Sequence, residues 1–303
     1  MTFDQLRYFL ETAKFEHLGK ASISLHISPS AVSSAIAALE SEFACKLFNR
    51  QGKGIILSEK GRYLRAQLEK IFDELTKIQL ALGEKEVRLS GSYRIGASPF
   101  LAVHYLGKVW AKTQGAYPQL STEIGATATA NVLSGVLSGV YDGGFCFSPL
   151  KHPHLKCFEI YKGQMQIAAR KGHPIFKSVA KQQFDLLNNY PASIHKATPG
   201  VDICEDHPMF EKFGLKPNIQ SLWDSDDVGV EIVSNSEAWA LLPELVVQCH
   251  RTKIQAIAMP KAWDAPYFIG FIIRPHRIEN PFLKLLMGEL KKAFENSASP
   301  TGG

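Results

Sequence analysis

The sequence predicts an α/β protein with an all-α N-terminal part, and three observations lead to this prediction. Short helical patterns and a basic hairpin fill residues 3–58, one long helical pattern follows to residue 87, and strand and helix patterns alternate from residue 93 onward. A chain of 303 residues is long enough for two or three domains. Its 45% hydrophobic and 21% charged residues are typical of a soluble globular protein, and its net charge of +5 indicates nucleic-acid binding only weakly.

Residues 18–58 contain two short amphipathic helices joined by a tight turn and followed by the hairpin. Apolar residues recur at helical spacing in the first helix, at Leu18, Ala21 and Leu25. Ser28 and Pro29 then read as the N-cap and first residue of a second helix, where the missing N–H of proline costs nothing. The second helix buries Val32, Ile36 and Leu39 and leaves Ser30, Ser33, Ser34 and Ala37 on its other side. This pattern predicts a helix-turn-helix whose second helix enters the major groove of DNA.

The second helix is expected to contact base edges, and the hairpin is expected to supply the positive charge. Small side chains let a helix approach base edges, hydroxyls bond a base edge or a phosphate, and Ala31 or Val32 suits a thymine methyl group. Between Phe43 and Arg65 the hairpin region carries six basic residues against one carboxylate, and Lys53 stands between two glycines. A lysine at such a tip reaches a phosphate or a minor groove. The candidate DNA-binding residues are Ser28, Pro29, Ser30, Ser33, Ser34, Arg50 and Lys53. The alternative is a three-helix bundle with a solvated basic rim.

Residues 3–61 closely resemble the winged helix-turn-helix of LysR-type transcriptional regulators. The matching residues are Leu6, Phe9, Ala21, Leu25, Ser28, Ala31-Val32-Ser33, Ile36, Leu39-Glu40, Leu47-Phe48, Arg50, Leu57 and Gly61. The family often carries arginine after its A-V-S triplet, whereas Ser34 stands there in this chain, which suggests a different base preference. The resemblance implies a winged helix-turn-helix domain over 1–58, a dimerising linker helix and hinge over 59–90, an effector-binding domain over 91–296, and a double-stranded DNA operator as partner.

The helical pattern after Ser58 has the spacing of a coiled coil. Its apolar residues lie four, three, four, three and four positions apart, at Leu64, Leu68, Ile71, Leu75, Ile78 and Leu82. Such a heptad seam over about three repeats is long enough to pair two chains, and the other faces of the helix are charged. We therefore expect a homodimer through this helix, and half-sites about 10 base pairs apart or a multiple of that. The resemblance further implies a dimer of dimers, a homotetramer, that acts on RNA polymerase access.

From Tyr93 to Phe147, strand patterns alternate with helix patterns, which predicts βαβ units and a parallel sheet covered on both faces. A second such set follows to residue 266. This half resembles the two-lobed, periplasmic-binding-protein-like effector domain of the same family, through Gly172-His173-Pro174 and Leu241-Leu242-Pro243-Glu244. Ser234-Asn235-Ser236 departs from the usual glycine-rich G-L-G. We expect lobe I at about 91–161 and 267–296, lobe II at about 162–266, and a disordered tail at 297–303.

In open α/β sheets, ligands bind beyond the carboxyl ends of the strands, so the effector site is expected between the lobes. The candidate effector-binding residues are Ser98, Pro99, Thr127, Thr129, Phe147 and Ser148 from lobe I and Ile194, His195, Ser225 and Asp226 from lobe II. Hydroxyls at helix starts suit a carboxylate, while Asp224, Asp226 and Asp227 favour an ammonium group. These groups suit a carboxylate, an amino acid or another small polar metabolite as the small-molecule effector, whose identity the sequence does not give. Each hydroxyl singly also fits an N-cap, and His195 a structural role.

The five cysteines are an odd number and do not form a disulfide framework. Cys146, His152, His154 and Cys157 combine two thiols and two imidazoles within twelve residues, although a structural zinc site usually has closer cysteine pairs. Cys204 lies where peroxide-sensing members of the family keep a reactive cysteine. Glu205 and Asp206 beside it would raise the pKa of its thiol. A thiol or metal sensor of the same regulator type is therefore one alternative.

The sequence carries no constellation that predicts catalysis or a cofactor. Ser98 lies in GASPF, which lacks the second glycine of a nucleophile elbow, and the chain contains neither a phosphate-binding P-loop nor a G-x-G-x-x-G motif. The N-terminus has no secretion-signal pattern and no apolar stretch is long enough to span a membrane, so we expect a cytoplasmic protein. The favoured function is an effector-controlled transcriptional regulator. A second alternative is a small-molecule binding protein that does not bind DNA.

Overall fold

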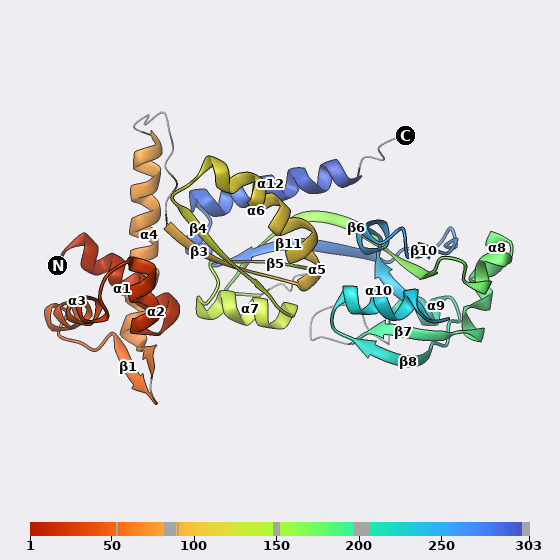
Figure 1. Ribbon diagram of the computed structural model, residues 1–303, viewed down its shortest axis with the longest axis horizontal. Helices are drawn as coiled ribbons and strands as arrows, with labels where there is room; N and C mark the ends of the chain where they lie inside the picture. The colour runs from red at the N-terminus through yellow and green to blue at the C-terminus, as the bar shows by residue number, and fades with distance from the viewer. Residues whose placement is uncertain (53, 82–88, 90, 148–151, 197–206, 299–303) are drawn as a thin grey trace. The chain divides into compact units, whose positions relative to one another are not determined.

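The computed structural model describes residues 1–52, 54–81, 89, 91–147, 152–196 and 207–298. The chain divides into two compact units (Figure 1). The first comprises Met1–Leu89 together with Pro275–Lys284, and the second comprises Ser90–Arg274 and Leu285–Gly303. Residues 275–284, which the sequence assigned to lobe I, therefore pack with the N-terminal unit.

The first unit begins with the predicted helix-turn-helix and hairpin. Its elements are α1 (Phe3–Phe15), α2 (Leu18–Leu25), α3 (Pro29–Glu42), β1 (Phe48–Gln51), β2 (Gly54–Leu57) and α4 (Glu59–Ala81). Phe9, Val32 and Leu39 are fully buried in a core shared by the three helices and the hairpin. Ser28 caps α3 and Pro29 is its first residue, as the sequence predicted. The strands β1 and β2 pair antiparallel, with Phe48 opposite Leu57.

The long helix α4 is anchored to the first unit by its N-terminal half. Leu68 is buried in the core of that unit, and Leu64 and Phe72 pack against the same core. Ile71 and Ile78 remain 47% and 53% exposed. Part of the predicted seam is therefore buried within the chain and part is exposed. The spacing of apolar residues could not distinguish the two, since a helix packed on its own domain and a helix in a coiled coil show similar spacing. Leu82 of the predicted seam and residues 83–88 and 90, at the end of the predicted linker and hinge, lie outside the described residues.

The second unit is built on a nine-stranded sheet in the order β4-β3-β5-β11-β6-β9-β7-β8, with β10 paired to β6. Its strands are β3 (Gly91–Ala97), β4 (Leu120–Ala126), β5 (Gly143–Phe147), β6 (Lys156–Arg170), β7 (Pro191–His195), β8 (Asn218–Trp223), β9 (Trp239–Pro243), β10 (Ile254–Ala256) and β11 (Pro266–Ile273). The sheet is mixed, not wholly parallel as predicted. The groups β4-β3-β5 and β9-β7-β8 are parallel, whereas β11 and β6 run antiparallel to each other and to their outer neighbours β5 and β9. Side-chain alternation has the same period in both kinds of strand and does not reveal direction.

The helices of the second unit, with their bounds, are α5 (Pro99–Leu101), α6 (Gly107–Thr113), α7 (Thr129–Ser138), α8 (Ala180–Gln183), α9 (Pro208–Lys212), α10 (Asp226–Ser234) and α11 (Glu244–Cys249). The helix α12 (Pro281–Ala298) has its first four residues in the first unit and the rest in the second. A π-helical turn, Ala102–Leu106, separates α5 from α6. The helices α6 and α12 lie on one face of the first half of the sheet and α7 on the other (Figure 1).

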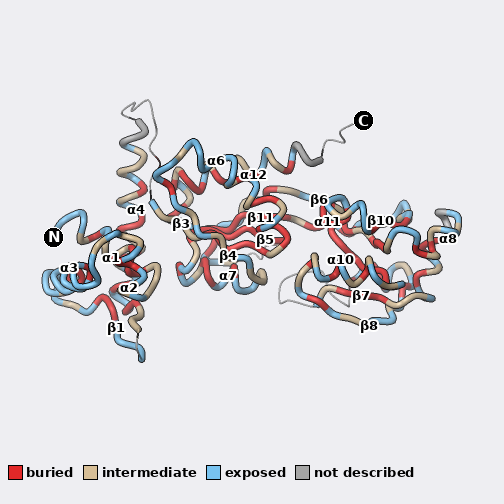
Figure 2. The backbone as a smooth tube through the Cα atoms, viewed as in Figure 1, coloured by how far each residue is buried: buried red, intermediate tan, exposed pale blue. Residues whose placement is uncertain are grey.

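Alternating side chains of β5 hold both layers of helices on the sheet. The Phe145 ring lies 6.0 Å from that of Phe294 in α12, which in turn stacks on Tyr105 at 4.1 Å. The next residue, Cys146, points to the opposite face and packs in a cluster with Val132 of α7. Because both faces are covered, β5 is buried along its whole length, as the red trace in Figure 2 shows.

The family-like motifs of lobe II have structural roles. His173 is buried, and its Nδ1 accepts the Ile175 N–H at 3.1 Å while its Nε2 lies 3.0 Å from the Glu237 carbonyl. Glu244 accepts the Tyr161 hydroxyl at 2.6 Å. Ser236 stands where a glycine was expected, and its hydroxyl donates to the Ile232 carbonyl and accepts the Ala238 N–H. A polar side chain thus ends α10 in place of glycine.

The C-terminal helix α12 extends to Ala298, so residues 297 and 298 are helical and not part of a disordered tail. Residues 299–303 lie outside the described residues. Within the described ranges, no single helix is long and apolar enough to cross a membrane; α2 and α3 meet that test only together, as a pair bent by 108°.

Candidate functional site

The N-terminus of α3 presents the hydroxyls that the sequence assigned to DNA. Ser28 Oγ accepts the Ala31 N–H at 3.2 Å and lies 2.9 Å from the Ser30 hydroxyl. Ser28 is therefore engaged as a cap, while Ser30 and Pro29 are exposed beside it. Ser33 and Ser34 are exposed one turn later, and Val32 is fully buried. Val32 is thus a core residue and not a contact for a thymine methyl group.

The hairpin carries Arg50 exposed on β1, and Lys53 lies outside the described residues. Not every basic residue of this region faces solvent. Arg65 is 6% exposed and bonds Glu69 and the Ala13 carbonyl, and Arg62 donates to the Leu57 carbonyl. Arg62 is itself exposed, so only Arg65, which pairs with Glu69 in the interior of the first unit, makes the free positive charge of the region smaller than the sequence predicted.

Glu40, near the end of α3, fixes the hairpin to the helix. Its Oε1 accepts the N–H groups of Leu47 and Phe48 at 2.8 and 3.2 Å, and its Oε2 pairs with Lys46 at 2.7 Å. Burial alone would raise the pKa of Glu40, but these hydrogen bonds and the Lys46 charge outweigh burial and lower it. The carboxylate therefore sets the position of Arg50 relative to α3. Sequence reasoning noted Glu40 only as a family match.

The lobe I candidates gather at the carboxyl ends of the parallel strands β3, β4 and β5. The Ser98 N–H bonds the Phe145 carbonyl, and the Thr127 N–H bonds the Ala97 carbonyl, so the three strand ends are joined. Ser98 is 7% exposed, and its Oγ is buried without a hydrogen-bond partner among the residues that the structure describes. The Thr127 hydroxyl accepts from Asn131 at 3.1 Å. Pro99 and Thr129 are half-buried, Phe147 is buried, and Ser148 lies outside the described residues.

The lobe II candidates differ in how they are placed. Ile194 is 1% exposed and belongs to the core of the lobe. The His195 ring packs edge-on against Trp223, its Nδ1 lies 2.8 Å from the Lys196 carbonyl, and burial lowers the pKa of the imidazole. Ser225 precedes α10 without capping it through its side chain. Asp226 is buried, and burial together with the Asp227 charge raises the pKa of its carboxyl to about 7.

A cluster that sequence reasoning missed links the two lobes beside these candidates. His104 of the π-helical turn and His250 after α11 both place Nε2 near Oδ1 of Asp227 in α10, at 3.3 and 3.1 Å. His104 and Asp227 are 123 positions apart, so no local spacing indicated the contact. The available signal was the acidic start of α10, where Asp226 and Asp227 are adjacent.

The cysteine-containing metal candidates are not assembled in the part of the chain that the structure describes. Among those residues, the one group of three or more potential ligands is His104, Asp227 and His250, not Cys146, His152, His154 and Cys157. Cys146 is buried, and burial raises the pKa of its thiol to about 12, which opposes the thiolate form that metals bind. Cys204 lies outside the described residues.

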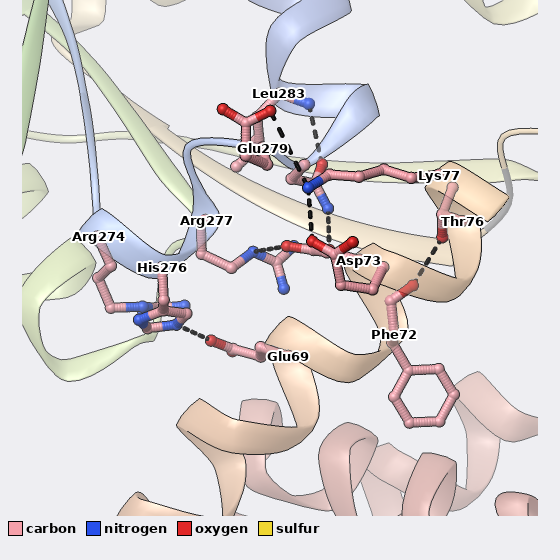
Figure 3. Close-up of polar contacts among 12 residues, drawn as sticks. Glu69, Phe72, Asp73, Thr76, Lys77, Arg274, His276, Arg277, Glu279 and Leu283 are labelled. Atoms are coloured by element: carbon pink, nitrogen blue, oxygen red, sulfur yellow. Dashed lines mark hydrogen bonds and ion pairs between the residues drawn. The ribbon is translucent and has the colours of Figure 1, made fainter. Parts of the chain in front are cut away.

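A second missed cluster is a buried polar network within the first unit (Figure 3). Arg65, Glu69 and Asp73 are buried on one face of α4, and Glu69 and Asp73 meet the 3-10 turn Pro275–Arg277 and the start of α12. Glu69 pairs with His276 at 2.6 Å, and Asp73 pairs with Arg277 at 3.6 Å. Burial raises the pKa of Asp73 despite the Arg277 charge.

A helix-turn-helix with exposed hydroxyls, followed by a two-lobed α/β unit, defines a DNA-binding protein with a ligand-binding domain, and comparison with known proteins agrees. The model for bacterial regulatory helix-turn-helix proteins of the lysR family matches residues 3–62, and the model for the LysR substrate binding domain matches residues 87–295. The chain belongs to the LysR family of transcriptional regulators.

Relatives and solved structures support this placement. GltR of Bacillus subtilis is 29% identical over 183 residues, which cover 60% of this chain and 62% of GltR. PcaQ of Agrobacterium fabrum is 24% identical over 301 residues, which cover 96% of this chain and 94% of PcaQ. The chain spans 50% of the length of YeiE of Escherichia coli K12 at 32% identity. The fold is similar to that of a full-length OxyR variant from Pseudomonas aeruginosa, with a TM-score of 0.69, 17% identity, and coverage of 96% of this chain and 95% of that one.

Proposed function

We propose that the chain is a sequence-specific transcriptional regulator whose operator binding is controlled by a small molecule held by the effector domain. The observation that carries this proposal is the exposed hydroxyl face of α3 beside Arg50, in a chain that also carries the LysR effector domain. Much of α3 is pale blue in Figure 2, which marks exposed residues.

The two parts of the DNA-binding domain act differently. Ser30, Ser33 and Ser34 read base edges because α3 is narrow and uncrowded on that side. Arg50 contacts phosphate or the minor groove and contributes affinity that depends on salt. Ser28 supports recognition indirectly, since its side chain caps the helix that presents the other serines.

The active form is a homodimer, and a dimer of two such dimers binds the operator. Ile71 and Ile78 support pairing through α4, because both are exposed apolar side chains seven residues apart on one face of the helix. A two-fold dimer favours a pseudo-palindromic operator.

The effector is an amino acid or another small carboxylate. A buried hydroxyl without a partner costs about 1–3 kcal/mol, so Ser98 favours a ligand that accepts its hydrogen bond. The buried Asp226 carboxyl opens α10, which contacts α5 directly after Ser98, so both groups stand near one contact between the lobes. A ligand that binds one arrangement of the lobes more tightly shifts the dimers, and with them DNA bending and polymerase access.

The test is recovery of genomic DNA fragments by the purified full-length protein at two salt concentrations. A two-fold-symmetric motif that persists at the higher salt is the expected result. Diffuse binding that disappears with salt would contradict sequence-specific regulation.

For the effector, thermal unfolding is measured with a panel of amino acids and carboxylates. Ser98→Ala is the test variant, and Ser134→Ala, an exposed serine on α7, is the matched control. The expected result is a ligand-dependent rise in melting temperature that only Ser98→Ala reduces. An equal rise in melting temperature in the unmodified protein and both variants would show that Ser98 does not contact the ligand.

A further inference from the structure

Three potential metal ligands from three different segments converge in the second unit. His104 lies in the π-helical turn after α5, Asp227 in the first turn of α10, and His250 directly after α11. One ligand atom from each lies within 4.8 Å of the other two. The Asp227 Oδ1 is the shared point, 3.3 Å from His104 Nε2 and 3.1 Å from His250 Nε2.

These separations are close to those of ligands around one tetrahedral metal ion. Bonds of about 2.0–2.2 Å to nitrogen and oxygen at tetrahedral angles place neighbouring ligand atoms about 3.3 Å apart. Small side-chain rotations would therefore let all three atoms bind one ion. With both imidazoles neutral, the set carries one negative charge, which attracts a cation.

The surroundings hold the two imidazoles in place while leaving a path to solvent. The Phe100 ring packs on His104 at 4.5 Å between centroids and lies 6.4 Å from His250. The side chains of His104, Asp227 and His250 are 20%, 37% and 17% exposed. His104 lies in a π-helical turn, a rare element that is found frequently at functional sites.

We propose that His104, Asp227 and His250 bind a divalent transition-metal ion of the kind that imidazole prefers, with Zn²⁺ as the test ion. The fourth position is open to water or to an oxygen or nitrogen atom of a small molecule. Because His104 belongs to lobe I and the other two ligands to lobe II, the ion stabilises the contact between the lobes. The proposal requires no DNA binding and is thus independent of the regulator function proposed above.

The same contacts also satisfy a simpler arrangement without metal. The Asp227 carboxylate can accept a hydrogen bond from each imidazole, since an ionised carboxylate has several acceptor sites. A metal site binds an added ion, whereas a purely hydrogen-bonded cluster does not, so a direct measurement of metal binding distinguishes the two arrangements.

The experiment uses the full-length chain, purified without a histidine tag, stripped with a chelator and titrated with Zn²⁺ by calorimetry. The test variants are His104→Ala, His250→Ala and Asp227→Asn, and the matched control is the double variant His152→Ala/His154→Ala. The control removes two imidazoles near each other that stand outside the proposed site. Melting temperatures in chelator show whether each variant is folded.

The expected result is one Zn²⁺ per chain for the unmodified protein and the control, with a melting temperature that rises on metal addition. Each test variant should raise the dissociation constant at least about tenfold, since loss of an outer-shell partner alone has an effect of that size. Equal affinity of the test variants and the unmodified protein would overturn the proposal.

A second measurement keeps the proposal testable if a variant fails to fold. Co²⁺ bound to the unmodified protein should show the intense visible absorption of a four-coordinate site. A spectrum identical to that of hydrated Co²⁺ would mean that the three side chains form only hydrogen bonds.

Discussion

The Asn280 side-chain amide donates a hydrogen bond to Oδ1 of Asp73 at 2.6 Å, across 207 positions of the sequence. Asn280 also accepts the Leu283 N–H at 3.0 Å and so caps the start of α12. Both side chains are buried, and the Glu69–His276 pair lies one turn of α4 away. Because Asp73, Asn280 and Glu69 are buried, removal of one of these groups takes from its partner a hydrogen bond that water cannot readily replace.

We expect Asn280→Ala to destabilise the first unit by about 2–4 kcal/mol, since two buried hydrogen bonds are lost and the Asp73 carboxylate keeps its burial. Urea denaturation followed by circular dichroism measures the change. Lys77→Ala on the same helix is the control, because its pairs with Glu74 and Glu279 lie at the surface, and it should change stability little. Equal effects of the two variants would mean that the network contributes nothing beyond a surface pair.

The exposed part of the α4 seam gives a prediction about assembly. Ile71→Asp and Ile78→Asp should each shift the protein from dimer to monomer, because a charge in an apolar seam must be desolvated on pairing. Sedimentation velocity across a concentration series measures the shift. Thr76 is a half-buried residue between the two isoleucines, and Thr76→Asp tests whether a charge anywhere on this stretch of α4 is sufficient to dissociate the dimer. A dimer that survives both isoleucine variants would place the interface elsewhere.

Two single variants test whether the α3 serines read base edges while Arg50 supplies salt-dependent affinity. Arg50→Ala should weaken binding to all sequences and reduce the salt dependence by about one counterion. Ser33→Ala should instead change the preference among operator variants by about 1–3 kcal/mol at one position. Binding is measured by fluorescence anisotropy on a set of single-base operator changes at several salt concentrations. If both variants lose affinity uniformly, base readout does not reside in α3.

Gly61 stands where α4 crosses Leu47 closely. A Cβ at this position would lie 2.1 Å from the Leu47 carbonyl oxygen, which is backbone and cannot rotate away. Gly61→Ala should therefore destabilise the first unit by about 2 kcal/mol or more. Gly288→Ala in α12 is the matched control, since no atom of the described residues lies within 4 Å of its Cβ position, and it should stabilise by about 0.5–1 kcal/mol. Thermal unfolding checks that Gly61→Ala lowers the melting temperature and that Gly288→Ala raises it.

Local signals in the sequence predicted the elements well and their long-range contacts poorly. The Ser28-Pro29 start of α3 follows from capping chemistry, and the succession of strands and helices from residue 93 onward follows from hydrophobic periodicity; both involve neighbouring residues. The antiparallel passage of β6 and β11 could not be predicted, because alternation does not record strand direction.

The same contrast between local patterns and long-range contacts explains which site residues the sequence predicted. The exposed serines of α3 follow from helical periodicity alone. The convergence of His104, Asp227 and His250 depends on a π-helical turn and on the packing of two lobes, neither of which has a local pattern. The sequence predicted charged faces on α4 beside the apolar seam, but no local pattern indicated that Glu69 and Asp73 are buried against residues from the end of the chain.

Glu40 links the stability of the DNA-binding domain to pH. The pKa of this carboxyl is lowered in the folded state, so its contribution to stability is present above about pH 4.5 and is lost as the pH falls through the lowered value. Glu40→Gln keeps an oxygen for the Leu47 and Phe48 N–H groups but removes the charge that pairs with Lys46.

The stability advantage of the unmodified protein over Glu40→Gln should therefore be full at pH 7 and disappear in acid. Glu40→Ala should cost about 1–3 kcal/mol at pH 7, because it leaves two backbone donors of the hairpin without their acceptor. Urea denaturation between pH 3.5 and 7 measures the three proteins, and Glu42→Gln, an exposed neighbour, is the control. A difference between the unmodified protein and Glu40→Gln that stays constant with pH would show that the hydrogen-bond geometry, and not the charge of Glu40, holds the hairpin against α3.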